Sequence, residues 1–386
     1  MDLKLKEMSD TSKLKDWTAA STAYAAVNAA TGKSIKTLYT SLASETVGLA
    51  TYNDYAAYYT TTAWADTFAT SALAGSGEFL NWDESSRREL LTKGTAYNNV
   101  FQYVAYRLRK GVSVCVKGGA NGALDWDVAW ALFAGSLEGA TGSGGGKSIY
   151  ALGDKRCPQF NTCKSGTALA TNNEKARMLW QEGSAALAAK DCFKAAANVP
   201  KIVSQMSVGM VQGAIREAWE VDRNPGGGWH VGDGVVEVAE GWAFLTAVLP
   251  QLAKCDAPKT KVIRDNMWLN AKPHAIEDGF GVIKSNFESM YACLGITCAD
   301  VGGMRFSNGT QIPGMEPCGI TTPVAAKSVV KSVVKSAVNV DADVAWGLGG
   351  ACAVLAVILV GVLLSQSSHC KCTTKSMVGS DTGSSA

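Results

Sequence analysis

Residues 83–109, DESSRRELLTKGTAYNNVFQYVAYRLR, decide the fold class that the sequence predicts. The stretch opens with acidic residues and closes with basic ones, which is the arrangement that the helix dipole favours. Val100, Val104 and Leu108 recur at four-residue steps, so they would share one face of a helix. We therefore expect a long amphipathic helix here.

Two further stretches, 126–137 and 235–249, are denser in apolar residues and predict buried helices. Glycine-rich loops at 139–146 and 224–228 separate segments of this kind. The sequence contains no run of alternating apolar and polar residues between hairpin turns, which is the pattern that would indicate β-strands. The predicted fold class is all-α.

A membrane anchor is expected near the C-terminus. The uncharged stretch 347–365, GLGGACAVLAVILVGVLLS, would span about 28 Å as a helix, close to the thickness of a bilayer core. We expect a single transmembrane helix at 346–366; a buried helix of a soluble domain is the alternative. Lys371 and Lys375 follow it, and the positive-inside rule then places a tail, 367–386, in the cytoplasm.

The remaining boundaries follow from composition. A stalk at 319–345 contains the repeat KSVVKSVVKSAV, whose lysines would form one helical stripe. It is interpreted as a solvated spacer or, alternatively, as a helix lying on lipid headgroups. Its lysines argue against placing the tail, rather than the stalk, on the cytoplasmic side. Ahead of it we expect a short N-terminal segment, 1–11, and an extracellular domain, 12–318, at the plasma membrane.

Eight of the cysteines precede the stalk, and this even number predicts up to four disulfides in an oxidising compartment. The close spacings of Cys157 with Cys163 and of Cys293 with Cys298 permit local bridges, although the pairing stays open. The sequon at Asn308 also suits secretion.

The charged stretch 1–17 lacks the apolar core of a secretory signal. We expect either a start farther upstream or a tail-anchored protein whose domain is cytoplasmic, with reduced thiols. The cysteines and the sequon favour the first of these alternatives.

The domain could contain two repeated halves. Residues 94–100 are followed by Asp127 and an apolar run, and residues 209–213 are followed at a similar distance by Glu240 and an apolar run. Each half would be a long helix followed by an apolar helix with an acidic residue near its start.

Several short blocks, in a fixed order along the chain, carry a resemblance to one family. They are LDWD (124–127), AGSLEG (134–139), YALGDKRC (150–157), VQG (211–213), EG (240–241), DNM (265–267), GITCADVGG (295–303) and PC (317–318). Over 12–318 the chain resembles the algal Fe-assimilating proteins, a low-iron-inducible periplasmic family. The resemblance implies a secreted or cell-surface protein that assists iron uptake, with a transporter or reductase at the plasma membrane as a partner.

The sequence offers oxygen ligands for iron. Iron(III) prefers carboxylate and phenolate oxygens, and the three histidines of the chain exclude a histidine-rich site. Glu237 and Glu240 are the favoured pair because residues three apart share a helical face. The predicted metal ligands are Glu240, Glu237, Asp127, Glu138 and Asp154, with Tyr150 and Tyr291 as phenolate candidates.

A structural role is the alternative for each acidic residue, which could cap a helix or pair with Arg156 or Arg216. The first half also departs from the family pattern, because Val128 stands where the family has a glutamate. That departure weakens the prediction of a metal site around Asp127.

The predicted function is non-catalytic binding or transfer of iron at the cell surface. A net charge of +2 argues against nucleic acid as a partner, and 47% hydrophobic residues argue against disorder. The chain contains no HExxH zinc motif and no flavin, haem or copper motif, so a ferrireductase-like ectoenzyme is disfavoured. The main alternative is an adhesion or cell-wall interaction module that binds no metal.

Overall fold

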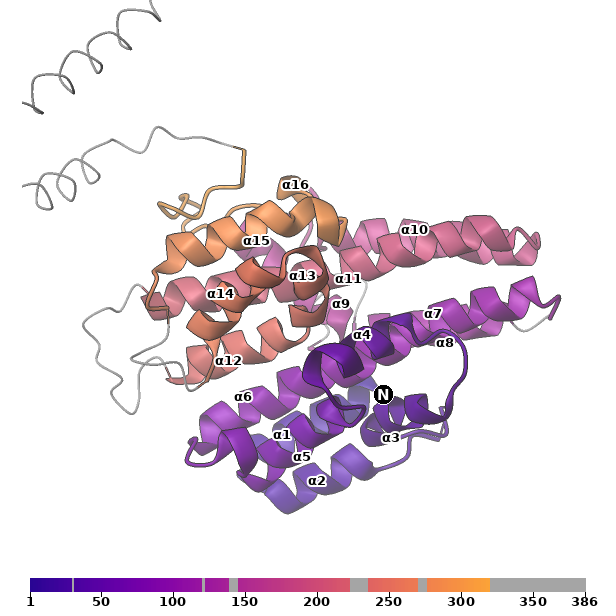
Figure 1. The fold of residues 1–386 in the computed structure, drawn as a ribbon, viewed down its shortest axis with the longest axis horizontal. Helices are drawn as coiled ribbons and strands as arrows, with labels where there is room; N and C mark the ends of the chain where they lie inside the picture. Colours follow the sequence, from indigo (N-terminus) through magenta and orange to yellow (C-terminus); the bar gives the residue numbers. More distant parts are fainter. Residues whose placement is uncertain (30, 120–121, 139–144, 223–234, 270–275, 320–386) are drawn as a thin grey trace, which may run out of the picture. The chain divides into compact units, whose positions relative to one another are not determined.

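The computed structural model describes residues 1–29, 31–119, 122–138, 145–222, 235–269 and 276–319. Within these ranges the secondary structure is helical, and the only extended pairings are three isolated bridges. Figure 1 shows the helices packed side by side. The predicted all-α class is confirmed.

The described residues contain two groups of helices along the chain. The first part of the chain contains α1 (Asp2–Lys13), α2 (Trp17–Ala25), α3 (Ile35–Thr40), η1 (Ser41–Ser44), α4 (Ala50–Tyr59), α5 (Trp64–Ala74), η2 (Gly77–Phe79), α6 (Glu84–Gly94), η3 (Thr95–Val100), α7 (Phe101–Val116) and α8 (Gly122–Ala134). The second part contains α9 (Ile149–Phe160), α10 (Thr171–Ala188), α11 (Cys192–Asp222), α12 (Val235–Thr246), α13 (Leu249–Cys255), α14 (Ala257–Met267), α15 (Phe280–Leu294) and α16 (Cys298–Val301).

The long helix predicted at 83–109 is present and continues beyond its predicted end. Asp83 caps it, because its carboxylate accepts hydrogen bonds from the backbone N–H groups of Ser85 and Ser86 at 2.8 and 3.0 Å. Helix α6 then runs into α7 through η3, a π-helical turn. Such a turn inserts an extra residue into the helix and is frequent at functional sites.

Two helical hairpins form the middle of the fold. One hairpin is α7 packed against α8, and the other is α10 packed against α11. Helix α11 also contacts α7, α9, α12 and α15. The two hairpins lie side by side in Figure 1. In each half of the chain a long helix therefore packs against the apolar helix that follows it, α7 with α8 and α11 with α12, as the proposed repeat would require.

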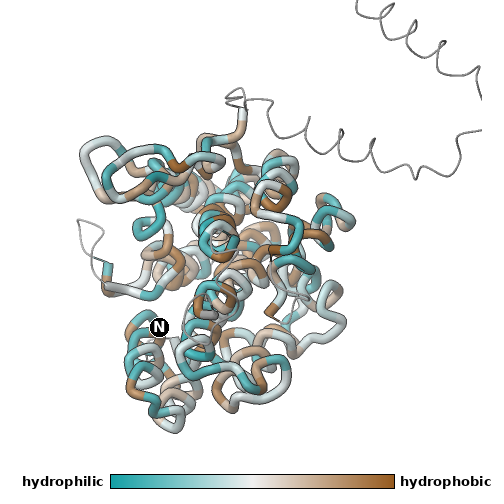
Figure 2. The backbone as a smooth tube through the Cα atoms, turned by 90° about the vertical axis from the view of Figure 1, so that its left-hand side faces the viewer, coloured by the Kyte–Doolittle hydropathy of each residue, from teal (hydrophilic) through white to brown (hydrophobic). Residues whose placement is uncertain are grey.

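The hairpins meet around Trp126, which is fully buried on α8. Its indole N–H donates to the Leu108 carbonyl at 3.0 Å, and the indole N–H of Trp180 donates to the Trp126 carbonyl at 3.1 Å. Gly183 of α10 lies against the ring, so closely that a Cβ atom there would come within 2.1 Å of it. Figure 2 shows hydrophobic and hydrophilic residues mixed along most helices, as expected for amphipathic helices around a core.

Four disulfides are present, which confirms the predicted disulfide-bonded domain. They join Cys115 to Cys192, Cys157 to Cys163, Cys255 to Cys293, and Cys298 to Cys318. The local bridge considered between Cys293 and Cys298 is wrong. The chain turns at Gly295, whose left-handed φ of 72° ends α15, so the two cysteines lie on different helices and face different partners.

Residues Met1–Thr321 form one compact unit. The segment 1–11 belongs to its core, because Leu5 and Met8 of α1 are buried. In the part of the chain that the structure describes, no helix has the length and apolar character needed to cross a membrane. The predicted span at 346–366, the tail at 367–386 and nearly all of the stalk at 319–345 lie outside the described residues.

Candidate functional site

Glu240, the first of the predicted ligands, lies on α12 and faces basic side chains of two other helices. Its carboxylate is 2.9 Å from the Lys93 ammonium of α6 and 4.0 Å from the Arg156 guanidinium of α9. Arg156 in turn pairs at 3.0 Å with Glu217 of α11, which Arg216 also contacts at 2.7 Å. The alternative role considered for Glu240, pairing with a basic residue, matches this arrangement.

A cavity of about 250 Å³ adjoins Glu240 and is rich in basic groups. Its walls come from α1, α6, η3, α9, α12 and the segment before α9. The charged residues of the lining are Lys13, Arg88, Lys93, Lys147, Lys155, Glu89 and Glu240. Five cations against two carboxylates give a net charge of +3, and both carboxylates already pair with Lys93.

The pKa values of the charged lining residues reflect this excess of positive charge. Burial lowers the pKa of the Lys147 and Lys155 ammonium groups, and neighbouring cations lower both further. Burial acts to raise the pKa of Glu89, but Lys93 and Arg88 outweigh it and lower that pKa to about 2. The cavity therefore has positive charge that no carboxylate of its lining offsets.

The π-helical turn η3 contributes to this cavity. Lys93 lies just before η3 and Tyr97 within it, and both line the cavity. The Tyr97 ring stacks on Phe244 of α12 with centroids 5.4 Å apart. This stacking holds α12, and with it Glu240, against the cavity wall.

Glu138 occupies a second location, where the charges of Asp2 and Asp154 act on it. Asp154 accepts hydrogen bonds from the backbone N–H of Ala170 at 2.7 Å and from the Asn173 side chain at 2.9 Å, so it secures the start of α10. The backbone of Gly146 lies against the half-buried carboxyl of Glu138, and its hydrogen bond acts to lower the pKa of that group. Burial, followed by the negative charges of Asp2 and Asp154, raises the pKa of Glu138 to about 7.

We expect Glu138→Gln to alter the pH dependence of stability. A carboxyl group whose pKa rises from 4.5 to about 7 on folding favours the folded state when it is protonated. Its contribution is complete below the unfolded pKa and is lost as the pH rises through about 7, so the wild-type melting temperature should fall more steeply over that range than the variant's. Thermal melts at several pH values measure this, with the exposed Asp127→Asn as a control. Parallel curves for wild type and Glu138→Gln would contradict the assignment.

Asp127 and Glu237 are not close to either location. Asp127 is exposed on α8. Glu237 is one helical turn before Glu240 but lines a separate pocket of about 10 Å³ with Met267 and Ile276, which is too small for a hydrated ion. In the described ranges, no group of three or more His, Cys, Asp or Glu side chains could hold a metal ion. The five predicted ligands therefore form no common site there, and a role for each one alone stays a prediction.

The basic lining was missed by the sequence reasoning. Lys13, Lys93 and Lys155 are about 60 to 80 residues apart in sequence, and only the folding of α1, α6 and α9 onto one another brings them together. The nearest signal was LGDKRC at 152–157, where two cations follow an acidic residue inside a helix.

Comparison with known proteins gives no family assignment. No family model, no curated protein and no solved structure matches the chain. The proposals below rest on the geometry of the described residues and on the resemblance noted for 12–318.

Proposed function

We propose that this protein assists iron assimilation at the cell surface, without catalytic turnover, by binding iron as an anionic carboxylate chelate in the cavity beside Glu240. One observation carries the proposal: five cationic side chains surround the cavity, while its two carboxylates already have cationic partners. Such a lining repels a bare ferric cation and attracts an oxygen-rich anion.

The chemistry of iron fits an anionic complex. Hydroxycarboxylates such as citrate supply the carboxylate and hydroxyl oxygens that hard iron(III) prefers. With those ligands in the chelator, the protein has no need of three acidic residues of its own. Arg88, Lys147 and Lys155 would then hold the outer carboxylates by charge-assisted hydrogen bonds.

The expected cellular role follows from the resemblance. A loaded protein would concentrate iron near a transporter or reductase of the plasma membrane and release it there. The rival functions are adhesion without metal binding and a ferrireductase-like activity. A direct measurement of chelate binding separates the first of these from iron assimilation.

We expect saturable binding of ferric citrate to the wild-type chain and at least about tenfold weaker binding by the double variant Lys147→Gln/Lys155→Gln. Each lost charge-assisted hydrogen bond is worth about 1.5–3 kcal/mol, and tenfold in Kd corresponds to about 1.4 kcal/mol. Equilibrium dialysis with radioactive iron as ferric citrate gives both constants. Lys164→Gln, at an exposed position away from the cavity, is the matched control and should bind like wild type.

Glu240→Gln distinguishes a chelate site from a bare-ion site. If Glu240 is a direct ligand, the variant loses iron; if the cavity binds an anion, the variant binds ferric citrate as well as wild type or better, with a lower melting temperature because Lys93 loses a partner. Absence of saturable ferric citrate binding by the folded wild type would overturn the proposal. If the protein bound citrate but not ferric citrate, the claim that the bound anion carries iron would be overturned.

A further inference from the structure

The loop that contains the sequon has a defined conformation. The backbone N–H of Gly309 donates to the Phe306 carbonyl at 2.8 Å, and the N–H of Phe306 donates to the Thr310 carbonyl at 2.9 Å. Gly309 has a φ of +82°, a left-handed value that glycine adopts without strain. These features are those of a tight hairpin turn closed by a left-handed glycine.

The Asn308 side chain is oriented by Thr310. Its carboxamide oxygen accepts hydrogen bonds from the Thr310 hydroxyl at 2.7 Å and from the Thr310 backbone N–H at 3.0 Å. No described residue accepts a hydrogen bond from its Nδ2, and Asn308 is exposed. The nitrogen that glycosylation modifies is therefore accessible and chemically free.

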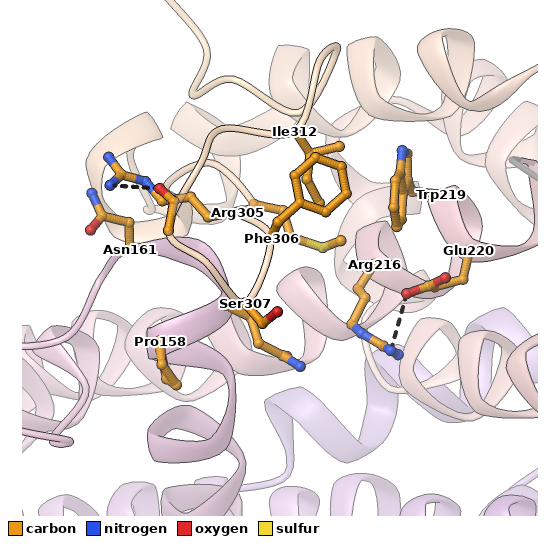
Figure 3. A pocket seen from close by; sticks show the side chains of 12 residues that line it. Pro158, Asn161, Arg216, Trp219, Glu220, Arg305, Phe306, Ser307 and Ile312 are labelled. Carbon is orange, nitrogen blue, oxygen red and sulfur yellow. Dashed lines mark hydrogen bonds and ion pairs between the residues drawn. The ribbon is translucent and has the colours of Figure 1, made fainter.

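A cavity of about 520 Å³ lies against the same loop (Figure 3). Both sequence neighbours of Asn308, Ser307 and Gly309, line it, so a group attached to Asn308 would start at its mouth. Figure 3 shows Phe306 beside Trp219 of α11, and the two rings meet edge to face with centroids 6.5 Å apart. Phe306 is 45% exposed, so part of its ring is open to a group at the mouth of the cavity.

We propose that Asn308 carries an N-linked glycan whose first sugar ring packs over the exposed Phe306 at the mouth of this cavity. A pyranose ring has an apolar C–H face that suits an aromatic ring and hydroxyl groups that suit polar side chains. The cavity offers such partners in Gln159, Asn161 and Arg305. The occupant is thus a group that the chain itself carries, and covering Phe306 removes its apolar surface from water.

The modification is a transfer without change of oxidation state. Asn308 Nδ2 forms a bond to C1 of a sugar supplied by a polyisoprenyl diphosphate oligosaccharide. The bond from C1 to the diphosphate oxygen breaks, the diphosphate leaves with the electron pair, and the amide nitrogen gives up one proton to a base of the transferring enzyme. The four disulfides fit the oxidising secretory compartment in which such donors are used.

The attachment is tested by expressing the full chain with a secretory leader in eukaryotic cells. Peptide mapping after amidase release in heavy-oxygen water should find Asn308 converted to labelled aspartate. Thr310→Ala keeps Asn308 but removes the hydroxyl and should abolish the label, whereas Thr310→Ser should retain it. Secreted, folded protein that carries no sugar at Asn308 would overturn the proposal.

The packing on Phe306 is tested with the glycosylated protein. We expect the amidase to release the glycan from folded Phe306→Ala at least about threefold faster than from wild type, because the sugar ring loses the aromatic face that covers it. Phe193→Ala, at a residue that is 87% exposed on α11, is the matched control and should match wild type. Equal release rates for wild type and Phe306→Ala would overturn the contact with Phe306 even if the glycan is present.

Discussion

Replacing Arg156 with methionine is expected to destabilise the fold by about 3 kcal/mol, because breaking a buried ion pair leaves a charge without compensation. Arg156 and Glu217 are each 1% exposed and lie 3.0 Å apart. Arg156 also donates to Gln159 at 2.8 Å and lies over the Phe244 ring at 5.1 Å. The expected loss stays at the lower end of the range for buried pairs because Arg216 still contacts Glu217.

Urea unfolding followed by circular dichroism measures this loss. Arg177→Met is the matched control: Arg177 pairs with Glu174 on the surface of α10, and such pairs are worth about 1 kcal/mol or less. The double variant Arg156→Met/Glu217→Met should recover part of the lost stability, because it removes both buried charges together. A loss for Arg156→Met no larger than for Arg177→Met would show that the buried pair contributes little.

The fold class could be predicted because the helices carry their signals locally. The apolar stretch 126–137 corresponds to α8, and the acidic start at Asp83 is the cap of α6. The stretch 235–249 was expected as one helix, but the chain breaks after Thr246 and α13 begins at Leu249. Pro250 explains this break, because it has no N–H to donate to the carbonyl of Thr246, four residues earlier, and it fits the first turn of a new helix.

The π-helical turn could not be predicted, since the apolar period runs through it without interruption. The nearest signal was the pair Asn98 and Asn99, two adjacent amides within the apolar period. Both are fully buried, and Asn99 donates at 3.2 Å to the Tyr24 hydroxyl, which donates to Asp66 at 2.8 Å. These partners lie on α2 and α5, so the reason for the amides is visible only in the folded chain.

The candidate site was predictable in part. Glu240 was predicted as an iron ligand, and that role stays a prediction; the structure shows it beside a cavity and paired with Lys93, which suits an acidic residue in an apolar helix. Its partner Lys93 and the lysines around it come from distant segments, and a single sequence has no signal for such proximity. The basic character of the cavity, on which the proposal of an anionic chelate rests, therefore required the structure.

Removing the disulfide between Cys115 and Cys192 is expected to cost about 4 kcal/mol in unfolding free energy. The bridge closes a loop of 77 residues, and closing a long loop restricts the unfolded chain most. It joins the end of α7 to the start of α11, so it ties together the two hairpins that form the middle of the fold. The variant Cys115→Ala/Cys192→Ala, unfolded in urea without reductant, gives the value, and mass spectrometry verifies the other three bridges.

The bridge between Cys298 and Cys318 is the matched comparison, because it closes a loop of only 20 residues. Cys298→Ala/Cys318→Ala should lose about 1 kcal/mol less than Cys115→Ala/Cys192→Ala, since the entropy of loop closure grows with the logarithm of loop length. The dependence of unfolding free energy on urea concentration should also become steeper in Cys115→Ala/Cys192→Ala, because the unfolded chain without the longer cross-link exposes more surface. An equal or larger loss of stability for the shorter loop would mean that native contacts around the bridges, rather than the length of the loops they close, determine how much each one stabilises this protein.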